Sequence, residues 1–153
     1  MGRFAVVADP QGAAFVLFRG SSERPPERLP QGTQGTVGWN ELHAGEREAA
    51  FAFYADLFGW REAEAFDMGP AGTYQLFAAG DGPVGGMMTK RESVPAPFWL
   101  YYFTVDAIDA ASVRVTGAGG RVLEGPHPVP GGSWILRCRD PQGAMFALVA
   151  PRR

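Results

Sequence analysis

The chain of 153 residues has a single cysteine, Cys138, which excludes an intrachain disulfide framework and a zinc site built from several cysteines. A lone cysteine in an apolar-polar alternation is typical of a small core residue rather than a nucleophile. The chain also lacks an excess of positive charge, because its net charge is -2 at pH 7. Without a basic field to hold a phosphate backbone, we expect no nucleic-acid partner.

Long hydrophobic runs are missing as well. No stretch approaches the roughly 18 consecutive apolar residues of a membrane-spanning helix, and residues 1–4 do not begin an apolar signal segment. We therefore expect a cytoplasmic protein with no membrane partner. Glycine and proline, in contrast, are abundant, with 21 and 13 residues scattered between apolar runs. This composition predicts short elements joined by tight turns and disfavours a helical bundle.

A five-residue motif occurs twice in the chain. Residues 9–13 and 140–144 both read DPQGA, and each copy is followed by phenylalanine and leucine at matching positions. Proline fixes the turn's second position, aspartate accepts backbone hydrogen bonds, and glycine supplies a positive φ. Because apolar runs flank both copies, each predicts a β-hairpin.

In the rest of the chain, the spacing of apolar residues alternates between the period of a strand and the period of a helix, and the same order of elements occurs twice. A period of two predicts a strand over 36–43, and a helical period over 46–58 ends at Gly59. The other predicted strands are 60–66, 73–79, 84–89, 98–105, 121–124, 133–139 and 144–150, with a second helix over 107–117. We therefore expect an α+β fold with βαβββ units at 36–90 and 97–151, preceded by a hairpin at 1–20 and a linker at 21–35.

Several short motifs resemble the vicinal oxygen chelate superfamily, also called the glyoxalase/bleomycin-resistance/dioxygenase family. They are A-x-x-F-Y from Ala50, L-F-G-W from Leu57, V-D-x-I-D from Val105 and the closing D-P-x-G hairpin. The resemblance implies that the two units form one cupped eight-stranded sheet whose concave face holds a ligand. The W-x-E-L strand from Trp39 is similar to a tandem-module, glyoxalase-like or hydroxylase-like branch. Hairpin 1–20 then corresponds to the end of an upstream module.

The resemblance also implies where a divalent metal would bind. Its usual ligands are a histidine in the first strand of each unit and a glutamate in the last. The corresponding residues here are Trp39, Leu100, Ala147 and one of Met87 and Met88. None is an ordinary ligand for a hard cation. We therefore expect no metal and no cofactor, which removes the Lewis acid on which glyoxalase and extradiol dioxygenase chemistry depends.

Glu41 and His43 are the candidate catalytic residues, because a two-residue alternation places them on the same strand face as Trp39. They could form an acid-base pair or bind a displaced metal. Alternatively, His43 caps the following helix or meets solvent while Glu41 pairs with an arginine. Burial of Glu41 would favour a functional role, since a buried carboxylate needs a partner.

Aromatic and apolar residues complete the expected ligand site, with Tyr102 on the face of Leu100 and with Trp99 and Tyr101 facing the helices. We expect ligand contacts from Trp39, Glu41, His43, Met88, Leu100, Tyr102 and Ala147. His127 is expected in a loop between strands at the rim of the cup, where a single proline-flanked histidine is a poor metal ligand.

Three functions fit these features. The favoured one is a metal-free member of the family that binds a small planar molecule. The alternatives are a glyoxalase-like lyase, isomerase or oxygenase that uses Glu41 and His43 or an atypical metal site, and an inactive module that supports a partner module. Hairpin 1–20 carries too much apolar surface to remain in water, which predicts a homodimer, with exchange of the hairpin between protomers as one form of it.

Overall fold

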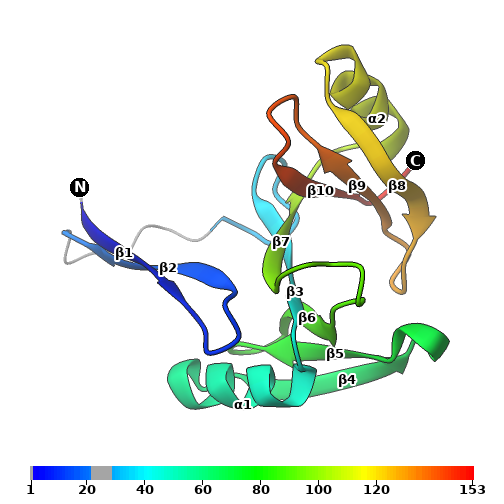
Figure 1. Cartoon of the computed structure of the whole chain (residues 1–153). Coiled ribbons are helices and arrows are strands. Elements are labelled where there is room, and N and C mark those ends of the chain that lie inside the picture. The colour runs from blue at the N-terminus through cyan, green and yellow to red at the C-terminus, as the bar shows by residue number, and fades with distance from the viewer. Residues whose placement is uncertain (1, 22–28) are drawn as a thin grey trace. The chain divides into compact units, whose positions relative to one another are not determined.

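The structure is a computed structural model that describes residues 2–21 and 29–153. Its strands form an eight-stranded mixed sheet in the order β4-β5-β6-β3-β7-β10-β9-β8 and a separate two-stranded hairpin, β1-β2 (Figure 1). The expected α+β class and the extra hairpin are confirmed. No helix in the described part of the chain is both long and apolar enough to cross a membrane.

The observed elements follow the predicted order. The strands are β1 (Gly2–Ala8), β2 (Ala14–Gly20), β3 (Val37–Ala44), β4 (Arg61–Asp67), β5 (Thr73–Ala78), β6 (Pro83–Thr89), β7 (Phe98–Thr104), β8 (Arg121–Pro128), β9 (Trp134–Arg139) and β10 (Met145–Ala150). The helices are α1 (Arg47–Phe58) and α2 (Ile108–Gly117), with a short 3-10 turn at Gly69–Ala71. Most of the expected linker, residues 22–28, lies outside the described residues.

The chain folds as two compact units. Unit 1 contains Met1–Leu29 and Glu41–Trp99, and unit 2 contains Pro30–Asn40 and Leu100–Arg153. Both β3 and β7 pass from one unit to the other along their length. The βαβββ boundaries expected from the sequence stay a prediction.

In unit 1, helix α1 has clear start and stop signals. The Glu46 side chain accepts hydrogen bonds from the backbone amides of Glu48 and Ala49, and Gly59 ends the helix in the left-handed conformation at φ 67°. Ala50 and Tyr54 are buried in the core with Leu42, whereas the predicted apolar face is partly exposed at its C-terminal end. The buried face thus covers only the first two-thirds of the helix.

The core of unit 2 lies between α2 and the hairpin β9-β10. It contains Ile108, Ala111, Leu136, Cys138, Leu148 and Ala150. Cys138 is 0% exposed, as expected for a small core residue.

Cys138 is therefore expected to be inert in the folded protein. Burial raises the pKa of its thiol to about 11, so only about one thiol in a thousand is ionised at pH 8. We expect a colorimetric disulfide reagent to react with Cys138 of the native protein only when the protein unfolds, and to react with all of the protein in urea. Stoichiometric reaction in seconds without denaturant would contradict this.

Strand β8 differs from the prediction, because it continues through Pro128 instead of ending at Glu124. Irregular register between Val122 and Glu124 and between Glu124 and His127 lets the strand accommodate the Gly-Pro pair, and β8 is an edge strand, where proline is tolerated. His127 thus pairs with Ile135 in a strand, and its expected place in a loop is wrong.

The two DPQGA copies form hairpins with the same register. Val6 pairs with Val16 in β1-β2, and Arg137 pairs with Ala147 at the matching position of β9-β10. In each turn the aspartate Oδ1 accepts two backbone N–H groups at 2.8–2.9 Å, and the glycine has φ of 98–99°. The repeat detected in the sequence is therefore also a repeat in structure.

Candidate functional site

The candidate site of unit 1 is centred on a buried carboxylate. Glu41 and His43 on β3 are 4% and 7% exposed, and the distance between Glu41 Oε1 and His43 Nε2 is 2.7 Å. The Tyr74 hydroxyl on β5 donates to the other carboxylate oxygen, Oε2, at 3.1 Å. One carboxylate thus holds both an imidazole and a phenol, and the alternative in which His43 meets solvent is wrong.

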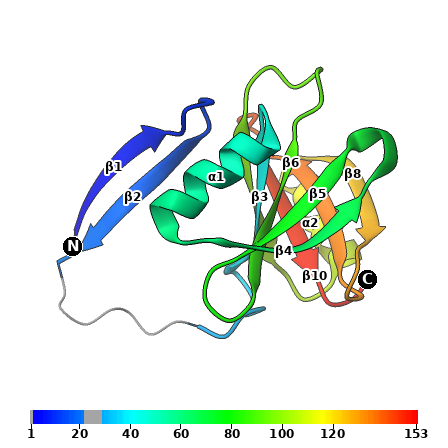
Figure 2. The same cartoon turned by 90° about the horizontal axis from the view of Figure 1, so that it is seen from below.

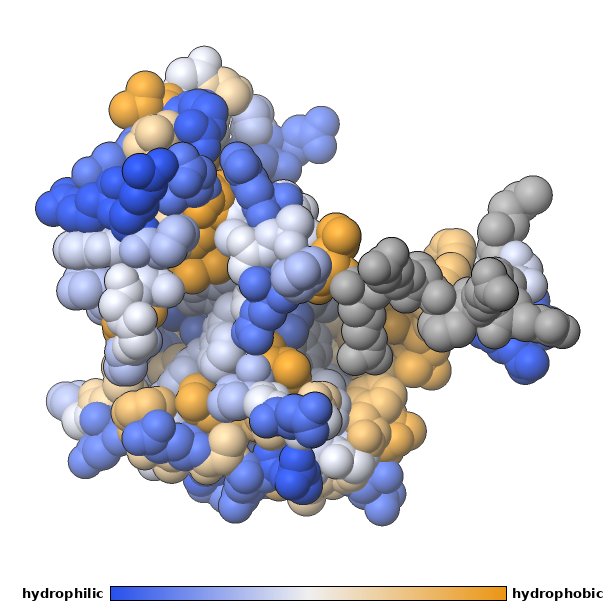
Figure 3. Space-filling model, turned by 180° about the vertical axis from the view of Figure 1, so that it is seen from behind, coloured by the Kyte–Doolittle hydropathy of each residue, from blue (hydrophilic) through white to orange (hydrophobic). Residues whose placement is uncertain are grey.

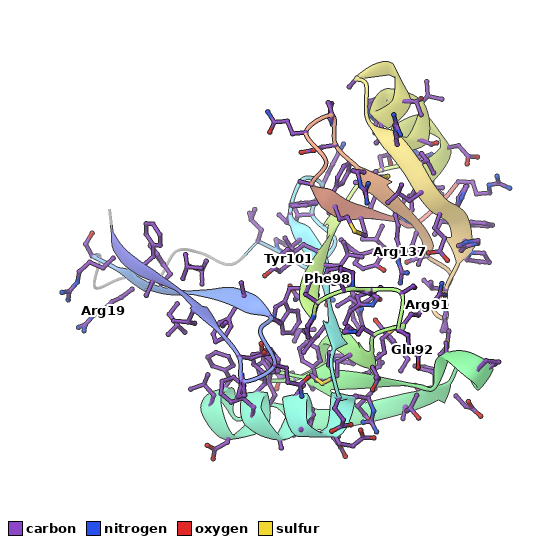
Figure 4. The ribbon with its side chains drawn as sticks, viewed as in Figure 1. Arg19, Arg91, Glu92, Phe98, Tyr101 and Arg137 are labelled. Carbon is purple, nitrogen blue, oxygen red and sulfur yellow. The ribbon has the colours of Figure 1, made fainter. Side chains whose placement is uncertain are left out.

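The ring of Phe98 covers the imidazole of His43. The two rings are stacked at 4.6 Å between centroids with an interplanar angle of 2°. Phe98 begins β7 and is labelled near the middle of Figure 4. Stacking fixes the plane of the imidazole, while the hydrogen bond to Glu41 fixes its rotation.

The arrangement also determines what the imidazole can do. An ionised carboxylate only accepts hydrogen bonds, so a proton on His43 Nε2 satisfies the contact with Glu41. In the neutral ring, Nδ1 then carries a lone pair that can accept a proton or a hydrogen bond. The cluster therefore combines a hydrogen-bond acceptor, a proton carrier and a flat aromatic surface.

Gly86 on β6 is required by the position of Tyr74. A Cβ atom at Gly86 would overlap the phenol ring of Tyr74. We expect Gly86→Ala to displace this ring and to lower the free energy of unfolding by about 1–3 kcal/mol, as other overpacked substitutions do. Gly82→Ala is the matched control, because a Cβ there meets no atom within 4 Å. Urea denaturation measures both, and equal stabilities would contradict the expected overlap.

Unit 2 has a second polar group, centred on Arg137 of β9. Its Nε donates to the Tyr102 hydroxyl at 3.3 Å, and its Nη1 lies 3.1 Å from Glu124 Oε2. Tyr102 is opposite Ala147 in the β7-β10 pairing, and Ala147 is opposite Arg137 in the β10-β9 pairing. Tyr102, Ala147 and Arg137 therefore form a row across neighbouring strands of unit 2.

Tyr74 and Arg137 were missed by the sequence analysis. A weak signal exists for both residues, because neighbouring residues of a strand point to opposite faces of the sheet. Tyr74 lies on the face opposite to Phe77, and Arg137 lies on the face opposite to the core residues Leu136 and Cys138. Alternation gives the face of a strand, but it does not identify the neighbouring strand whose side chain comes within reach.

The other expected contact residues are distributed over both units. Met88 belongs to unit 1 and is 9% exposed, whereas Leu100 and Ala147 of unit 2 are fully buried and Trp39 is half-buried. Trp99 packs on α1 as predicted, and its indole N–H donates to the Tyr54 hydroxyl at 3.1 Å.

The residues at the positions implied for a metal do not fit one. Trp39, Leu100, Ala147 and the two methionines offer no imidazole and no side-chain oxygen donor. The described residues also contain no group of three or more histidine, cysteine, aspartate or glutamate side chains that could hold an ion. His127 lies 3.9 Å from Glu124, and both side chains are largely exposed.

Comparisons with known proteins agree on one family. The model of the Glyoxalase/Bleomycin resistance protein/Dioxygenase superfamily matches residues 36–148. The Mycobacterium tuberculosis protein CFP32, named as a candidate glyoxylase, is 31% identical over 150 residues, which cover 98% of this chain and 56% of that protein. The anthracycline biosynthesis protein DnrV of Streptomyces peucetius is 36% identical over 156 residues, with coverage of 99% and 54%. The chain thus spans about half the length of these relatives.

Solved structures show the same fold. The methylmalonyl-CoA epimerase of Mycobacterium tuberculosis superposes with a TM-score of 0.59 at 19% identity, covering 78% of this chain and 91% of the epimerase. At this identity the similarity concerns the fold alone.

Proposed function

The chain belongs to the glyoxalase/bleomycin resistance protein/dioxygenase superfamily, and we propose that it binds a small planar organic molecule without a metal ion. The observation that carries this proposal is the cluster of the buried Glu41 and His43 with the half-buried Tyr74, beside the ring of Phe98. Small-molecule sites combine apolar walls with a few fixed polar groups, which is the composition of this cluster. The polar side chains of the cluster would orient polar groups of the ligand, and the ring of Phe98 would pack on the flat face of the ligand.

The class of ligand is suggested by one pair of relatives. Two of the matching proteins are named for anthracycline biosynthesis, at 36% and 34% identity. Anthracyclines are planar aromatic molecules with hydroxyl and carbonyl groups at their edges. We therefore choose an anthracycline as the first probe ligand for this site.

Elemental analysis and thermal unfolding test the proposal together. We expect purified protein to contain far less than one Zn, Ni, Fe or Mn ion per chain, and an anthracycline to raise its melting temperature, because a ligand that binds only the folded state stabilises it. A stoichiometric metal would overturn the metal-free proposal. Absence of stabilisation by the anthracycline and a wider set of aromatic metabolites would favour the alternative of an inactive structural module.

A second function is favoured by the contact between the His43 imidazole and the Glu41 carboxylate. If Nδ1 accepts a proton from a carbon acid while Glu41 stabilises the charged ring, the site would act as a lyase or isomerase through general base catalysis. The test is loss of a carbon-bound proton signal of a hemithioacetal substrate in D₂O, followed by NMR. Proton exchange that persists in His43→Gln would mean that another residue acts as the base.

The assembly and location expected from the sequence stay predictions. Exposed apolar side chains on the hairpin support a homodimer, including Phe4 at 71% and Phe18 at 70% exposure. Light scattering at micromolar concentration is the measurement, and a monomer would contradict it. A cytoplasmic location is likewise proposed and is tested by fractionation of cells that express the protein.

A further inference from the structure

Unit 2 carries positive charge that its own carboxylates do not neutralise. It contains six arginines and four carboxylate side chains, a net side-chain charge of +2, whereas the whole chain has a net charge of -2. Three of these arginines form ion pairs, which are Arg137 with Glu124, Arg152 with Asp106 and Arg153 with Asp109. Within the residues that the structure describes, Arg114, Arg121 and Arg139 have neither an ion pair nor a side-chain hydrogen bond. Strongly hydrophilic residues of unit 2, in dark blue, are visible in the upper part of Figure 3.

Two of the unpaired arginines lie opposite each other on neighbouring strands. Arg121 of β8 pairs with Arg139 of β9, and β8 is the edge strand beside β9 (Figure 2). Opposite residues of an antiparallel pair point to the same face of the sheet, with Cβ atoms about 5 Å apart. The next pair, Val122 and Cys138, packs in the core with α2. Arg121 and Arg139 therefore both point away from α2, and both are exposed.

The pairing of these two guanidinium groups is unfavourable by itself. Like charges directly opposite each other in a sheet are destabilising, and arginine stays charged in proteins. The carboxylate of Glu124, opposite Arg137, already accepts from that arginine at 3.1 Å. The carboxylate of Asp140, next to Arg139 in the chain, accepts two backbone amides of its own turn. An anion bound between Arg121 and Arg139 would therefore remove a repulsion that the chain itself leaves in place.

Two further side chains flank the arginine pair on the same face. Met145 of β10 is opposite Arg139 and is 43% exposed. Arg137, two residues before Arg139 on β9, also points to this face, where the Tyr102 hydroxyl and the Glu124 carboxylate hold its guanidinium group. The row Met145, Arg139 and Arg121 thus places a flexible apolar side chain beside two unpaired cations.

We propose that Arg121 and Arg139 bind the phosphate group of a small organic phosphate at the β8-β9 edge of unit 2. A phosphate monoester carries a charge of about -1.5 to -2 at pH 7, which matches the two unpaired guanidinium groups. Each guanidinium group is a planar fork of N–H donors that fits two phosphate oxygens. A carboxylate would neutralise only one of the two arginines. Met145 would contact the organic part of the ligand, because its flexible thioether adapts to apolar groups. None of the residues of the Glu41 cluster takes part in this site.

Titration of the full chain with phenyl phosphate in phosphate-free buffer tests the site. We expect saturable binding by calorimetry, with NMR shifts of the side-chain Nε–H signals of Arg121 and Arg139. Arg121→Gln and Arg139→Gln should each weaken binding about tenfold, because hydrogen bonds between charged groups are lost. Each substitution also removes the repulsion across the strands, so neither should lower the midpoint of urea unfolding without ligand. A lower midpoint in both variants would contradict that repulsion.

Arg114→Gln is the matched control, because Arg114 is an exposed arginine of α2, which packs on the other face of the β9-β10 hairpin. It loses the same charge and should leave the dissociation constant unchanged. Equal weakening in Arg114→Gln would mean that net charge alone causes the binding, and unchanged constants in Arg121→Gln and Arg139→Gln would place the phosphate elsewhere. Either result, or no saturable binding, would overturn the proposal. Benzoate that binds as tightly as phenyl phosphate would overturn the choice of phosphate, and inorganic phosphate that binds as tightly would overturn the contact with Met145.

Discussion

Replacement of Tyr54 by alanine is expected to lower the free energy of unfolding by about 3–5 kcal/mol, the range for large-to-small substitutions of buried aromatic residues. Tyr54 is 1% exposed and packs against Phe15, Phe53 and Trp60. Its hydroxyl also joins the Trp99 indole to the Asp9 carboxylate. The substitution therefore removes a core ring and leaves a buried carboxylate oxygen without its donor.

Tyr54→Phe separates these two contributions. It keeps the ring and removes only the hydroxyl, so we expect a loss of about 1–3 kcal/mol from the unsatisfied polar groups. Tyr101→Ala is a matched control, because Tyr101 is 41% exposed. Urea denaturation gives the three free energies. A loss below about 1 kcal/mol for Tyr54→Ala would show that hairpin β1-β2 and α1 do not depend on this residue.

Replacement of Glu41 by glutamine is expected to weaken binding of the anthracycline probe by about 10- to 100-fold. Hydrogen bonds to a charged group contribute about 1.5–3 kcal/mol each, and about 1.4 kcal/mol corresponds to a tenfold change in affinity. Glutamine is nearly the same size as glutamate, but its amide is neutral and has one accepting oxygen. It therefore cannot accept charge-assisted hydrogen bonds from both His43 and Tyr74. The imidazole and phenol would then no longer be fixed in the geometry that the ligand meets.

Glu62→Gln is the matched control for this variant. Glu62 is an exposed residue of β4, so the same change of charge occurs away from the cluster. Isothermal titration calorimetry measures both dissociation constants. Equal weakening of binding in the two variants would mean that the change in net charge causes the effect. An unchanged dissociation constant in Glu41→Gln would mean that the ligand binds away from Glu41.

Much of the fold could be predicted from local signals. The proline and glycine of each DPQGA turn fix the backbone without help from distant residues, and Gly59 ends α1 by its own left-handed conformation. The extent of β8 could not be predicted in this way. It depends on pairing with β9 around two irregularities, and the local Gly-Pro and Pro-Val-Pro pattern alone favours a loop.

The candidate site was only partly predictable for a related reason. Alternation along β3 correctly places Glu41 and His43 side by side, because residues two apart share a strand face. Their partners, Tyr74 and Phe98, come from strands that are far away in the sequence. Such contacts depend on strand order and register, which no local pattern specifies.

The chemistry of the positions that the family resemblance implies for a metal can be read from the side chains alone. At these implied positions Trp39, Leu100 and Ala147 have side chains that cannot coordinate a hard cation. The polar residues that the structure gathers instead lie two and four positions further along β3 from Trp39. In the proposed site a carboxylate and an imidazole therefore take the place of a metal ion.

The most direct test of this interpretation is calorimetric titration of the anthracycline into the full chain with EDTA present, and again after EDTA is replaced by an excess of Zn²⁺, Ni²⁺ or Mn²⁺. A metal-free site predicts saturable binding in EDTA without a requirement for any of the added ions, once the complex that each ion forms with the anthracycline itself has been measured without protein. Binding that disappears in EDTA and returns with one of the ions would contradict it.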